Sequence, residues 1–509
     1  MKKYLIRLFA LLLCFGIIFA GCQGNIQTPE STECVHTDTD ANGLCDACQI
    51  SVIVTFNIYN INDLHGKIAD GENHPGVDEL TTYLNNAKAN EEHTIILSSG
   101  DMWQGSSESN LTRGALTTEW MNEVGFSAMA LGNHEYDWGE EPIEQNAELA
   151  EFPFLAINIY DRDTNERVDY CQSSTMVDLG PIQIGIIGAM GDCYSSIAAD
   201  KTTGVYFKVG SELTELVMAE SEALRTQGAD YIVYILHDGY GQSLSSAVSN
   251  IKSSQMRSYY DVALSDGYVD LVFEGHTHQR YVLKDVHGVY HLQNKGENKG
   301  ISHVAISYNL VTQTSTIKKS DLVVNGRYVN LEDDPIVEEL LGKYNDQIAP
   351  AMEVVGTNAK ARQGDEMRQL VADLYYETGM KVWGDKYDIA LGGGFISVRS
   401  PWNLSAGEVT YGMLQSLFPF DNDLVLCSIK GRDLQSRFFE TSNDNYFICY
   451  GDYGESIRNN IDPNATYYVI VDTYSASYAH NNLTVVEEYE KGIYARDLIA
   501  EYMRQGGLS

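Results

Sequence analysis

The chain is poor in positive charge. Its 509 residues include 34 Lys and Arg against 71 Asp and Glu, which gives a formal net charge of −37 at pH 7. Bulk electrostatics therefore argue against binding to nucleic acid or to an anionic membrane surface. An anionic substrate would have to be attracted by metal ions and a few local arginines, and most of the acidic excess is expected to form a solvated surface.

Long apolar runs are also scarce. Only the first 22 residues combine a basic start with an apolar stretch, and no later stretch is long and apolar enough to span a bilayer. A membrane-spanning anchor is the alternative for this segment, but the run is short and contains Arg7. Because Phe19-Ala20-Gly21-Cys22 resembles a lipobox, we expect residues 1–22 to be a lipoprotein signal peptide. Cys22 would then be the lipidated N-terminus of an exported protein anchored to the cell envelope.

Cysteine is infrequent, and three cysteines lie in one short polar segment. Cys34, His36, Cys45 and Cys48 form the pattern C-x-H-x₈-C-x₂-C, which could close a tetrahedral zinc site. The same segment begins like a calcium loop at Asp38 but has Gln rather than Glu at the twelfth position. A small zinc or calcium site and a flexible tether both stay open for residues 23–50.

Four further cysteines fall in the expected folded domains. They form two pairs whose members are 22 residues apart in the sequence, Cys171 with Cys193 and Cys427 with Cys449. An exported location permits disulfide bonds. The sequence does not decide whether these bonds form.

The sequence shows no internal repeat and no long low-complexity tract, and its length predicts two ordinary domains. Residues 51–330 alternate strand-like and helix-like runs, as in a layered α/β domain. Proline at positions 335 and 350 brackets an expected connecting helix within residues 331–350. A second α/β domain is expected over residues 351–509. Helices are expected at Val77–Asn90, Ala115–Val124, Glu141–Ala150, Ser211–Thr226 and Met367–Met380.

Polar clusters follow five of the strand-like runs. They are Asn62-Asp63-Leu64-His65, Gly100-Asp101, Gly132-Asn133-His134-Glu135, His237-Asp238 and Gly275-His276-Thr277-His278. The carboxyl edge of an open α/β sheet is where ligands bind. Asp, Asn and His side chains gathered at one such edge indicate a site for two borderline-hard metal ions. Two adjacent metal ions can bind both the attacking and the leaving oxygen of a phosphoryl displacement.

The order and spacing of these motifs resemble those of the calcineurin-like metallophosphoesterases. More closely, residues 51–509 are similar to the exported two-domain 5′-nucleotidases. The resemblance implies an α/β fold with a layered α/β/β/α metallophosphoesterase domain followed by an α/β nucleotide-binding domain. It also implies two divalent metal ions (Mn, Zn or Co). Asp101 should bridge them, with Asp63, His65 and His278 on one ion and Asn133, His237 and His276 on the other.

His134 and Asp137 are expected to have a separate role. By resemblance, the His of the Asn-His-Glu-x-x-Asp motif faces the substrate phosphate and binds no metal. A carboxylate three residues later can orient the ring and stabilise its cation. His134 would then stabilise the transition state and help to protonate the leaving oxygen. Glu135 is expected to serve local structure.

The C-terminal half carries the resemblance less closely. Gly392-Gly393-Gly394 and Phe418-Pro419-Phe420-Asp421-Asn422 resemble the family's glycine-rich and Pro-Phe-x-Asn loops, but Ile396 stands where the family usually has Arg. Phe420 and Tyr474 could clamp a nucleobase between flat faces, or they could be core residues. The candidates for phosphate contacts are Arg362, Arg368 and Arg399.

These observations favour hydrolysis of a small phosphate ester, most simply a nucleoside 5′-monophosphate, by a monomeric enzyme that binds no nucleic acid. The same metal centre could cleave 2′,3′-cyclic nucleotides or nucleotide sugars. A surface binding lipoprotein that has lost the chemistry is the alternative outside the enzymes, and the intact ligand set and the His134–Asp137 pair argue against it.

Overall fold

The computed structural model describes residues 36–40, 42–70, 75–244, 248–396, 398, 403–439, 448–478 and 482–509. The expected signal peptide, Cys22, Cys34 and Arg399 therefore lie outside the described residues. The chain divides into two compact units, Met1–Val52 and Ile53–Ser509. Within the part that is described, no helix has the length and apolar character needed to cross a membrane.

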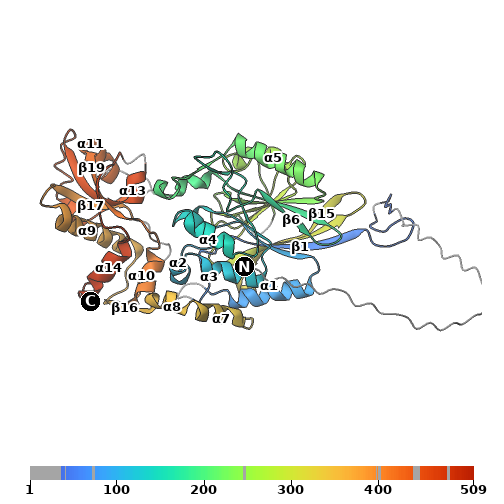
Figure 1. Cartoon of the computed structure of the whole chain (residues 1–509), viewed down its shortest axis with the longest axis horizontal. Helices are drawn as coiled ribbons and strands as arrows, with labels where there is room; N and C mark the ends of the chain where they lie inside the picture. The colour runs from blue at the N-terminus through green and yellow to red at the C-terminus, as the bar shows by residue number, and fades with distance from the viewer. Residues whose placement is uncertain are drawn as a thin grey trace, which may run out of the picture. The chain divides into compact units, whose positions relative to one another are not determined.

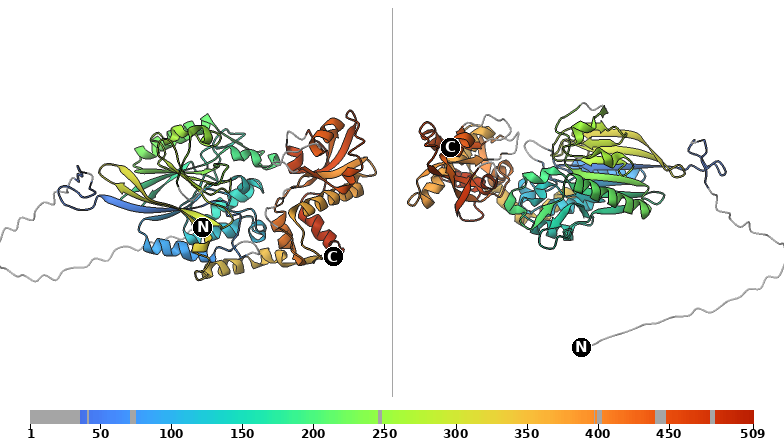
Figure 2. Two further views of the ribbon diagram at one scale, coloured as in Figure 1. Left: turned by 180° about the vertical axis from the view of Figure 1, so that it is seen from behind. Right: turned by 90° about the horizontal axis from the view of Figure 1, so that it is seen from above.

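The first sheet of the Ile53–Ser509 unit has six strands in the order β15-β14-β1-β2-β3-β4. β1 to β4 run parallel to one another, and β14 and β15 extend the sheet as antiparallel neighbours. Figure 2 shows blue β1 beside yellow β14, far from it in sequence. The bounds are β1 (Ile53–Ile61), β2 (Thr94–Ser98), β3 (Ala128–Ala130), β4 (Phe154–Leu155), β14 (Gly300–Asn309) and β15 (Thr314–Val324).

The second sheet has seven strands in the order β10-β12-β13-β11-β9-β7-β6. Its central strands β7, β9, β11 and β13 are parallel, while β6 is antiparallel to β7 and β12 is antiparallel to β13. The edge strand β10 is parallel to β12. The bounds are β6 (Ser174–Asp178), β7 (Gln183–Met190), β9 (Tyr231–His237), β10 (Ser249–Asn250), β11 (Leu271–Glu274), β12 (Tyr281–Lys284) and β13 (Tyr290–Gln293).

The two sheets pack face to face, because one buried cluster joins side chains from both. Phe56 and Ile58 of β1 share this cluster with Ile186 of β7 and Val233 of β9. The helices α1 (Asp78–Asn90), α3 (Ala115–Val124) and α4 (Glu141–Leu149) cover the outer face of the first sheet, and α5 (Ser211–Thr226) covers the second (Figure 1). The layers are α/β/β/α, as the sequence predicts. The polar clusters, however, follow strands of two sheets rather than one.

Short elements complete this half. They are α2 (Ser107–Leu111), η1 (Asn133–Tyr136), the pair β5 (Ile159–Asp161) and β8 (Val205–Phe207), η2 (Asp192–Ser196), η3 (Ala199–Lys201), α6 (Ser253–Met256), η4 (Val262–Ser265) and η5 (Asn325–Arg327). They lie in the connections between strands, which is where binding residues usually gather.

The connection expected as one helix between the two prolines has three parts: α7 (Pro335–Lys343), α8 (Asn345–Ile348) and η6 (Ala349–Met352). Asp334 caps α7 by accepting a hydrogen bond from the Ile336 amide, and Pro335 occupies the first turn. Tyr344 interrupts the helix with φ −92° and ψ 5°. Its ring is buried and its hydroxyl donates to Glu119 at 2.9 Å, so a tertiary contact ends the helix.

The C-terminal half is built on a five-stranded sheet in the order β20-β17-β21-β19-β22. The helices α9 (Gly364–Trp383), α10 (Tyr411–Leu417) and α14 (Ala495–Arg504) share one buried cluster with this sheet. The strands of this sheet are β17 (Ile389–Phe395), β19 (Leu424–Lys430), β20 (Ile448–Tyr450), β21 (Thr466–Asp472) and β22 (Thr484–Glu488), and β16 (Val354–Asn358) and β18 (Gly407–Thr410) form a separate two-stranded sheet. The remaining helices are α11 (Gly431–Leu434), η7 (Gln435–Phe439), α12 (Asp452–Glu455) and α13 (Thr473–Ser477).

The three glycines expected to form a loop lie instead inside β17, so that prediction is wrong. A Cβ on Gly392 would overlap the backbone of Ala372 and Tyr376 in α9. Gly394 has φ +124° and lies against Ser475. These glycines therefore permit close packing of strand and helix rather than a turn. In the same half Cys427 forms no disulfide bond, and neither do Cys171 and Cys193 of the first half.

The described part of the Met1–Val52 unit is a tight loop. An antiparallel bridge joins Leu44 to Ser51, and the Cys45 amide donates to the Ile50 carbonyl at 2.8 Å. Cys45 is fully buried, whereas Cys48 is partly exposed. Hydrogen bonds from the Cys48 backbone and the His36 side chain lower the pKa of the Cys45 thiol to about 5.

Candidate metal centre and active site

The candidate ligands stand just past the carboxyl ends of β1, β2, β3 and β11, or, for His237, on the last residue of β9. Five of them have a left-handed backbone, with φ of 53° at Asp63, 53° at His65, 56° at Asp101, 69° at His276 and 51° at His278. Residues other than Gly rarely adopt this conformation, and those that do concentrate at functional sites. The backbone thus marks the strand ends where the sequence predicts metal ligands.

The first ligand group is Asp63, His65 and His278, whose donor atoms all lie within 4.8 Å of one another. The Nε2 atoms of His65 and His278 are 3.0 Å apart, and His278 Nε2 is 3.4 Å from Asp63 Oδ1. Asp63 and His65 are fully buried, whereas 36% of the His278 side chain is exposed. The three side chains thus converge on one point at the edge of the first sheet.

The second group is Asp101, Asn133, His237 and His276. His237 Nε2 lies 3.1 Å from both Asp101 Oδ2 and Asn133 Oδ1. His276 Nδ1 lies 2.9 Å from the same Asn133 oxygen. Asp63, Asp101 and His237 also have donor atoms within 4.8 Å of one another, so the two groups adjoin. Asp101 is the carboxylate placed between them.

Divalent cations fit this donor set, and the reason is the hydrogen-bonding state of the rings. The Nδ1 atoms of His65 and His237 face the backbone carbonyls of Gln104 at 2.8 Å and Ser99 at 2.6 Å, which can only accept. Nδ1 therefore carries a proton whether the ring is neutral or charged, and Nε2 is the atom that points into the cluster. His65 Nε2 faces His278 Nε2, and His237 Nε2 faces the oxygens of Asp101 and Asn133, an arrangement that a cation between the atoms stabilises.

The charges of the ligands agree with this reading. Burial raises the pKa of Asp101, but His237 and His134 lower it to well below its usual range, so the carboxylate is ionised. Burial lowers the pKa of His276 to about 4, which keeps that ring neutral and able to bind a metal. Burial would lower the pKa of His237 as well, yet Asp101 and Asp63 raise it to about 10. The site therefore has a negative potential that attracts positive charge.

His134 lies beside the ligands without being one of them. Its Nδ1 is 2.8 Å from Asp137 Oδ2, and its backbone amide donates to Asp101 Oδ1 at 2.8 Å. The ring faces a cavity of about 230 Å³. The residues lining this cavity come from both halves of the unit: Asn133, His134, Asp137, Ser196, Ala198, Lys201, His276, Phe420, Asp421, Asn422 and Tyr474.

Comparison with known proteins shows what the chain is similar to. A profile of the calcineurin-like phosphoesterase family matches residues 56–280. The chain is 25% identical over 394 residues to protein UshA of Yersinia enterocolitica, in a match covering 69% of this chain and 68% of UshA. Its fold is similar to that of a 5′-nucleotidase precursor from Thermus thermophilus, with a TM-score of 0.65, 18% identity, and coverage of 89% of this chain and 96% of that one. The comparisons thus support a calcineurin-like phosphoesterase domain over residues 56–280 and a metal-dependent phosphoester hydrolase similar to the 5′-nucleotidases.

A further relative of this metallophosphoesterase is much longer. The chain is 27% identical over 417 residues to endonuclease YhcR of Bacillus subtilis, in a match that covers 75% of this chain. That match spans only 32% of the endonuclease. These similar proteins therefore differ in length and in the activities for which they are named.

Glu135 connects the two metal-bearing loops of the metallophosphoesterase. Its carboxylate accepts hydrogen bonds from the amides of Gly132 at 2.7 Å, Asp101 at 2.9 Å and Met102 at 2.8 Å. Burial, with Asp101 nearby, raises the pKa of Glu135 to about 7. The residue thus holds the loop after β2 against the loop after β3.

Two of the three arginines predicted to bind phosphate do not line the cavity, and the third, Arg399, lies outside the described residues. Arg362 donates to the Lys360 carbonyl at 3.3 Å, and Arg368 pairs with Asp365 on α9. Neither is among the described residues that line the cavity with His134. Phe420 and Tyr474 do line it, and the Phe420 ring centroid is 5.9 Å from that of His134.

Sequence reasoning missed Lys201, which is the one Lys or Arg among the described residues lining this cavity. It ends η3, and its ammonium is 3.4 Å from Asp200. No motif surrounds it, so only the fold reveals its position. Arg113 and Arg496 were also missed, and both of them pair with Asp421 beside the cavity.

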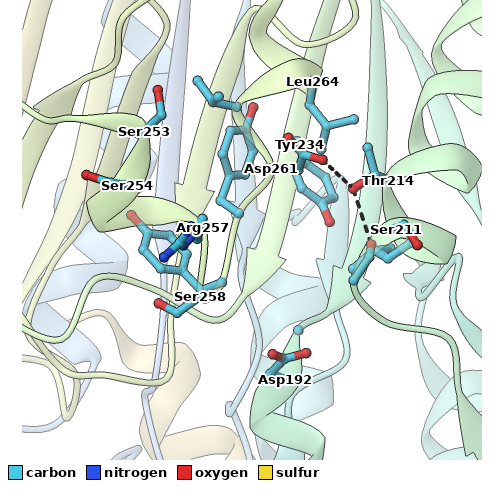
Figure 3. Close-up of a pocket in the computed structure, with 16 residues that line it drawn as sticks. Asp192, Ser211, Thr214, Tyr234, Ser253, Ser254, Arg257, Ser258, Asp261 and Leu264 are labelled. Atoms are coloured by element: carbon cyan, nitrogen blue, oxygen red, sulfur yellow. Dashed lines mark hydrogen bonds between the residues drawn. The ribbon is translucent and has the colours of Figure 1, made fainter.

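A larger cavity, of about 560 Å³, lies elsewhere in the same unit (Figure 3). It is bordered by the start of α5, with Ser211 and Thr214, and by Arg257 and Asp261 near η4. The described residues that line it include none of the candidate metal ligands. Size alone therefore does not identify the active site, and the convergence of the ligands does.

Proposed function

We propose that the chain hydrolyses nucleoside 5′-monophosphates to nucleoside and inorganic phosphate. One observation supports this most: the cavity beside the metal ligands is lined both by His134 and Asp137 and by Phe420 and Tyr474. It therefore offers groups for phosphate chemistry and flat faces for a base in one space. The acidic chain, with a net charge of −37, favours a small substrate over a nucleic acid.

Asp63, His65 and His278 would hold one divalent ion, Asn133, His237 and His276 the other, and Asp101 would be shared. When bound, such a pair supplies a hydroxide nucleophile near neutral pH and neutralises the charge of the transferred phosphoryl group. Mn²⁺, Zn²⁺ and Co²⁺ suit the mixture of Asp, Asn and His ligands.

His134 would act on the leaving oxygen. Asp137 accepts a hydrogen bond from the ring Nδ1, so the ring is oriented and its cation is stabilised. The Nε2–H of the cation then donates to the phosphate and transfers its proton to the departing alkoxide. Lys201, on the cavity wall, would pair with the phosphate or ribose side of the substrate.

The test is hydrolysis of a matched panel of substrates by the metal-loaded full chain, with the products of each substrate separated and identified by chromatography. The panel contains AMP and other 5′-monophosphates, 2′,3′-cyclic AMP, UDP-glucose, and single-stranded and double-stranded DNA. We expect the highest kcat/KM with a 5′-monophosphate. A preference for the cyclic nucleotide or the nucleotide sugar would assign that activity instead, and cleavage of DNA alone would contradict the proposal.

Loss of chemistry is tested in the same samples. If the chain binds two metal ions and AMP but hydrolyses none of these substrates, it is a binding lipoprotein. We also propose that the chain is exported, lipid-anchored at Cys22 and monomeric. Mass spectrometry of the protein from cells, compared with Cys22→Ser, should show the lipid, and light scattering of the delipidated protein should show one chain per particle.

A further inference from the structure

The Met1–Val52 unit contains a second group of metal-ligand residues, distinct from the active site. The donor atoms of His36, Cys45 and Cys48 all lie within 4.8 Å of one another. Cys48 Sγ is 3.5 Å from His36 Nδ1. A tetrahedral zinc ion, with Zn–S of about 2.3 Å and Zn–N of about 2.0–2.1 Å, requires a sulfur–nitrogen separation of roughly 3.5 Å. The observed distance is the edge of such a tetrahedron.

Local hydrogen bonds place the two sulfur atoms on one side of the loop. The Cys45 amide donates to Ile50 O at 2.8 Å, and the Gln49 amide donates to Cys45 O at 2.8 Å. Gln49 has φ 57°, which turns the chain sharply after Cys48. The two cysteines are therefore held in a C-x₂-C turn, the spacing that zinc sites use.

Apolar burial alone does not account for this fold. Among the described residues 36–52, the buried apolar side chains are Cys45 and Val52, while Leu44 and Ile50 are 38% and 61% exposed. A segment this short cannot fold on so small a core without a metal or a covalent bridge. The free energy of binding a structural zinc ion is large enough to fold such a segment.

We propose that His36, Cys45 and Cys48 bind one structural zinc ion, in addition to the catalytic pair, and that this ion folds the segment that precedes the catalytic unit. Two thiolates and an imidazole suit zinc better than they suit the hard cations. The sequence offers Cys34, two residues before His36, as a fourth ligand; it lies outside the described residues, and the proposal is based on the other three.

The carboxylates of the same loop supply the matched control. Those of Asp38, Asp40 and Asp46 lie within 4.8 Å of one another, but each accepts hydrogen bonds from the loop. An oxygen cluster of this kind would favour calcium. Asp40→Asn therefore changes the loop without changing a proposed zinc ligand.

The experiment measures zinc per chain in the full-length protein, purified under reducing conditions, and compares it with Cys45→Ser, Cys48→Ser and Asp40→Asn. Each cysteine variant should lose one zinc ion per chain and keep its rate of AMP hydrolysis. Asp40→Asn should lose none. In the Co²⁺-substituted protein, a near-ultraviolet thiolate-to-cobalt absorption band should disappear in Cys48→Ser and remain in Cys171→Ser.

Three results would overturn the proposal. One is an unchanged zinc content in both cysteine variants. The second is a protein from the cell envelope in which Cys45 and Cys48 are joined by a disulfide bond, seen by mass spectrometry as the loss of two hydrogen atoms. The third is calcium binding that is lost in Asp40→Asn, together with the absence of a thiolate-to-cobalt band. Because AMP hydrolysis is measured on the same samples, failure here is separated from failure of the catalytic proposal.

Discussion

At the residue scale, the candidate ligands combine unfavourable backbone conformations with strong local hydrogen bonding. A left-handed backbone costs about 1 to 3 kcal/mol for a residue such as Asp or His. At Asp63 and His65 it is fixed by hydrogen bonds from their amides to the carbonyls of Gly100 and Asp101, at 2.9 and 3.1 Å. These hydrogen bonds hold the loop after β1 against the loop after β2. The strained backbone lowers the stability of the fold, and it positions the ligand side chains.

His134→Asn tests the proton donor separately from the metals. We expect kcat for AMP to fall by roughly 10²- to 10⁴-fold, the usual size of a general acid–base effect, while the metal content stays unchanged. The fall in kcat should be smaller for nitrophenyl phosphate, because its leaving group needs no proton. Equal losses with both substrates would restrict His134 to stabilising the charge of the transition state.

Phe420→Ala and Tyr474→Ala test the base clamp. If these rings stack on the base, KM for AMP should rise by the equivalent of about 1 to 3 kcal/mol, because base–aromatic stacking is of that size. Hydrolysis of a phosphate ester without a base serves as the control and should change little. If KM rises equally for AMP and for the ester without a base, the two aromatic residues belong to the core.

Lys201→Met tests the lysine that only the fold revealed. Losing a charged contact to the substrate should raise KM for AMP about tenfold, or about 1.4 kcal/mol, without changing the metal content. Lys208→Met is the matched control, because that ammonium lies over the Tyr160 ring, 3.7 Å from its centroid. Equal kinetic effects of the two variants would exclude a direct role for Lys201.

At the element scale, a buried network supports the loop that follows β11. His291 Nδ1 is 2.7 Å from Glu274 on β11, and its Nε2 is 3.4 Å from Asp285. Gln293 donates to the Gly275 carbonyl at 2.8 Å, directly before His276. The position of a candidate metal ligand thus depends on strands β11 and β13.

The network predicts a pH dependence of stability. Burial lowers the pKa of His291, but Glu274 and Asp285 raise it above its ordinary value near 6.5. A raised folded-state pKa stabilises the protein fully below about 6.5 and stabilises it less as the pH rises through the folded-state pKa. His291→Gln should lower the free energy of unfolding by about 3 to 5 kcal/mol, because it leaves buried carboxylates unpaired, and it should reduce that pH dependence.

Denaturant unfolding at several pH values measures both effects, with His287→Gln as the matched control. His287 is 3.8 Å from Asp266, at a position where both side chains are exposed, so its loss should cost little. An unchanged pH profile in His291→Gln would show that this histidine is not the titrating group.

Elements with a clear periodicity could be predicted from the sequence. The bounds of α3 and α5 match the expected helices Ala115–Val124 and Ser211–Thr226, because their apolar residues recur along one face. The glycines of β17 were misassigned, since glycine allows close packing as well as turns. The break at Tyr344 depends on its contact with Glu119, which is distant in sequence. Tertiary contacts therefore determined the elements that local patterns could not.

At the scale of the whole molecule, the sequence predicts the positions of motifs that follow strand ends. It does not predict which side chains from separate loops meet in space. All seven candidate ligands follow apolar runs, so the parallel strands bring them together. Asp421 accepts from Arg113 at 2.5 Å, a contact between residues 308 positions apart for which the sequence has no signal. Arg362 and Arg368, chosen by proximity to motifs, do not line the cavity.

In the proposed reaction, two metal ions at these ligands hydrolyse a nucleoside 5′-monophosphate. A decisive measurement removes metal from the full chain with a chelator, adds Mn²⁺, Zn²⁺ or Co²⁺, and follows phosphate release from AMP beside Asp101→Ala. We predict no activity without metal, recovery with about two ions per chain, and a loss of more than about 100-fold in Asp101→Ala. Full turnover by Asp101→Ala with both ions bound, or by the metal-free chain, would rule out this reaction.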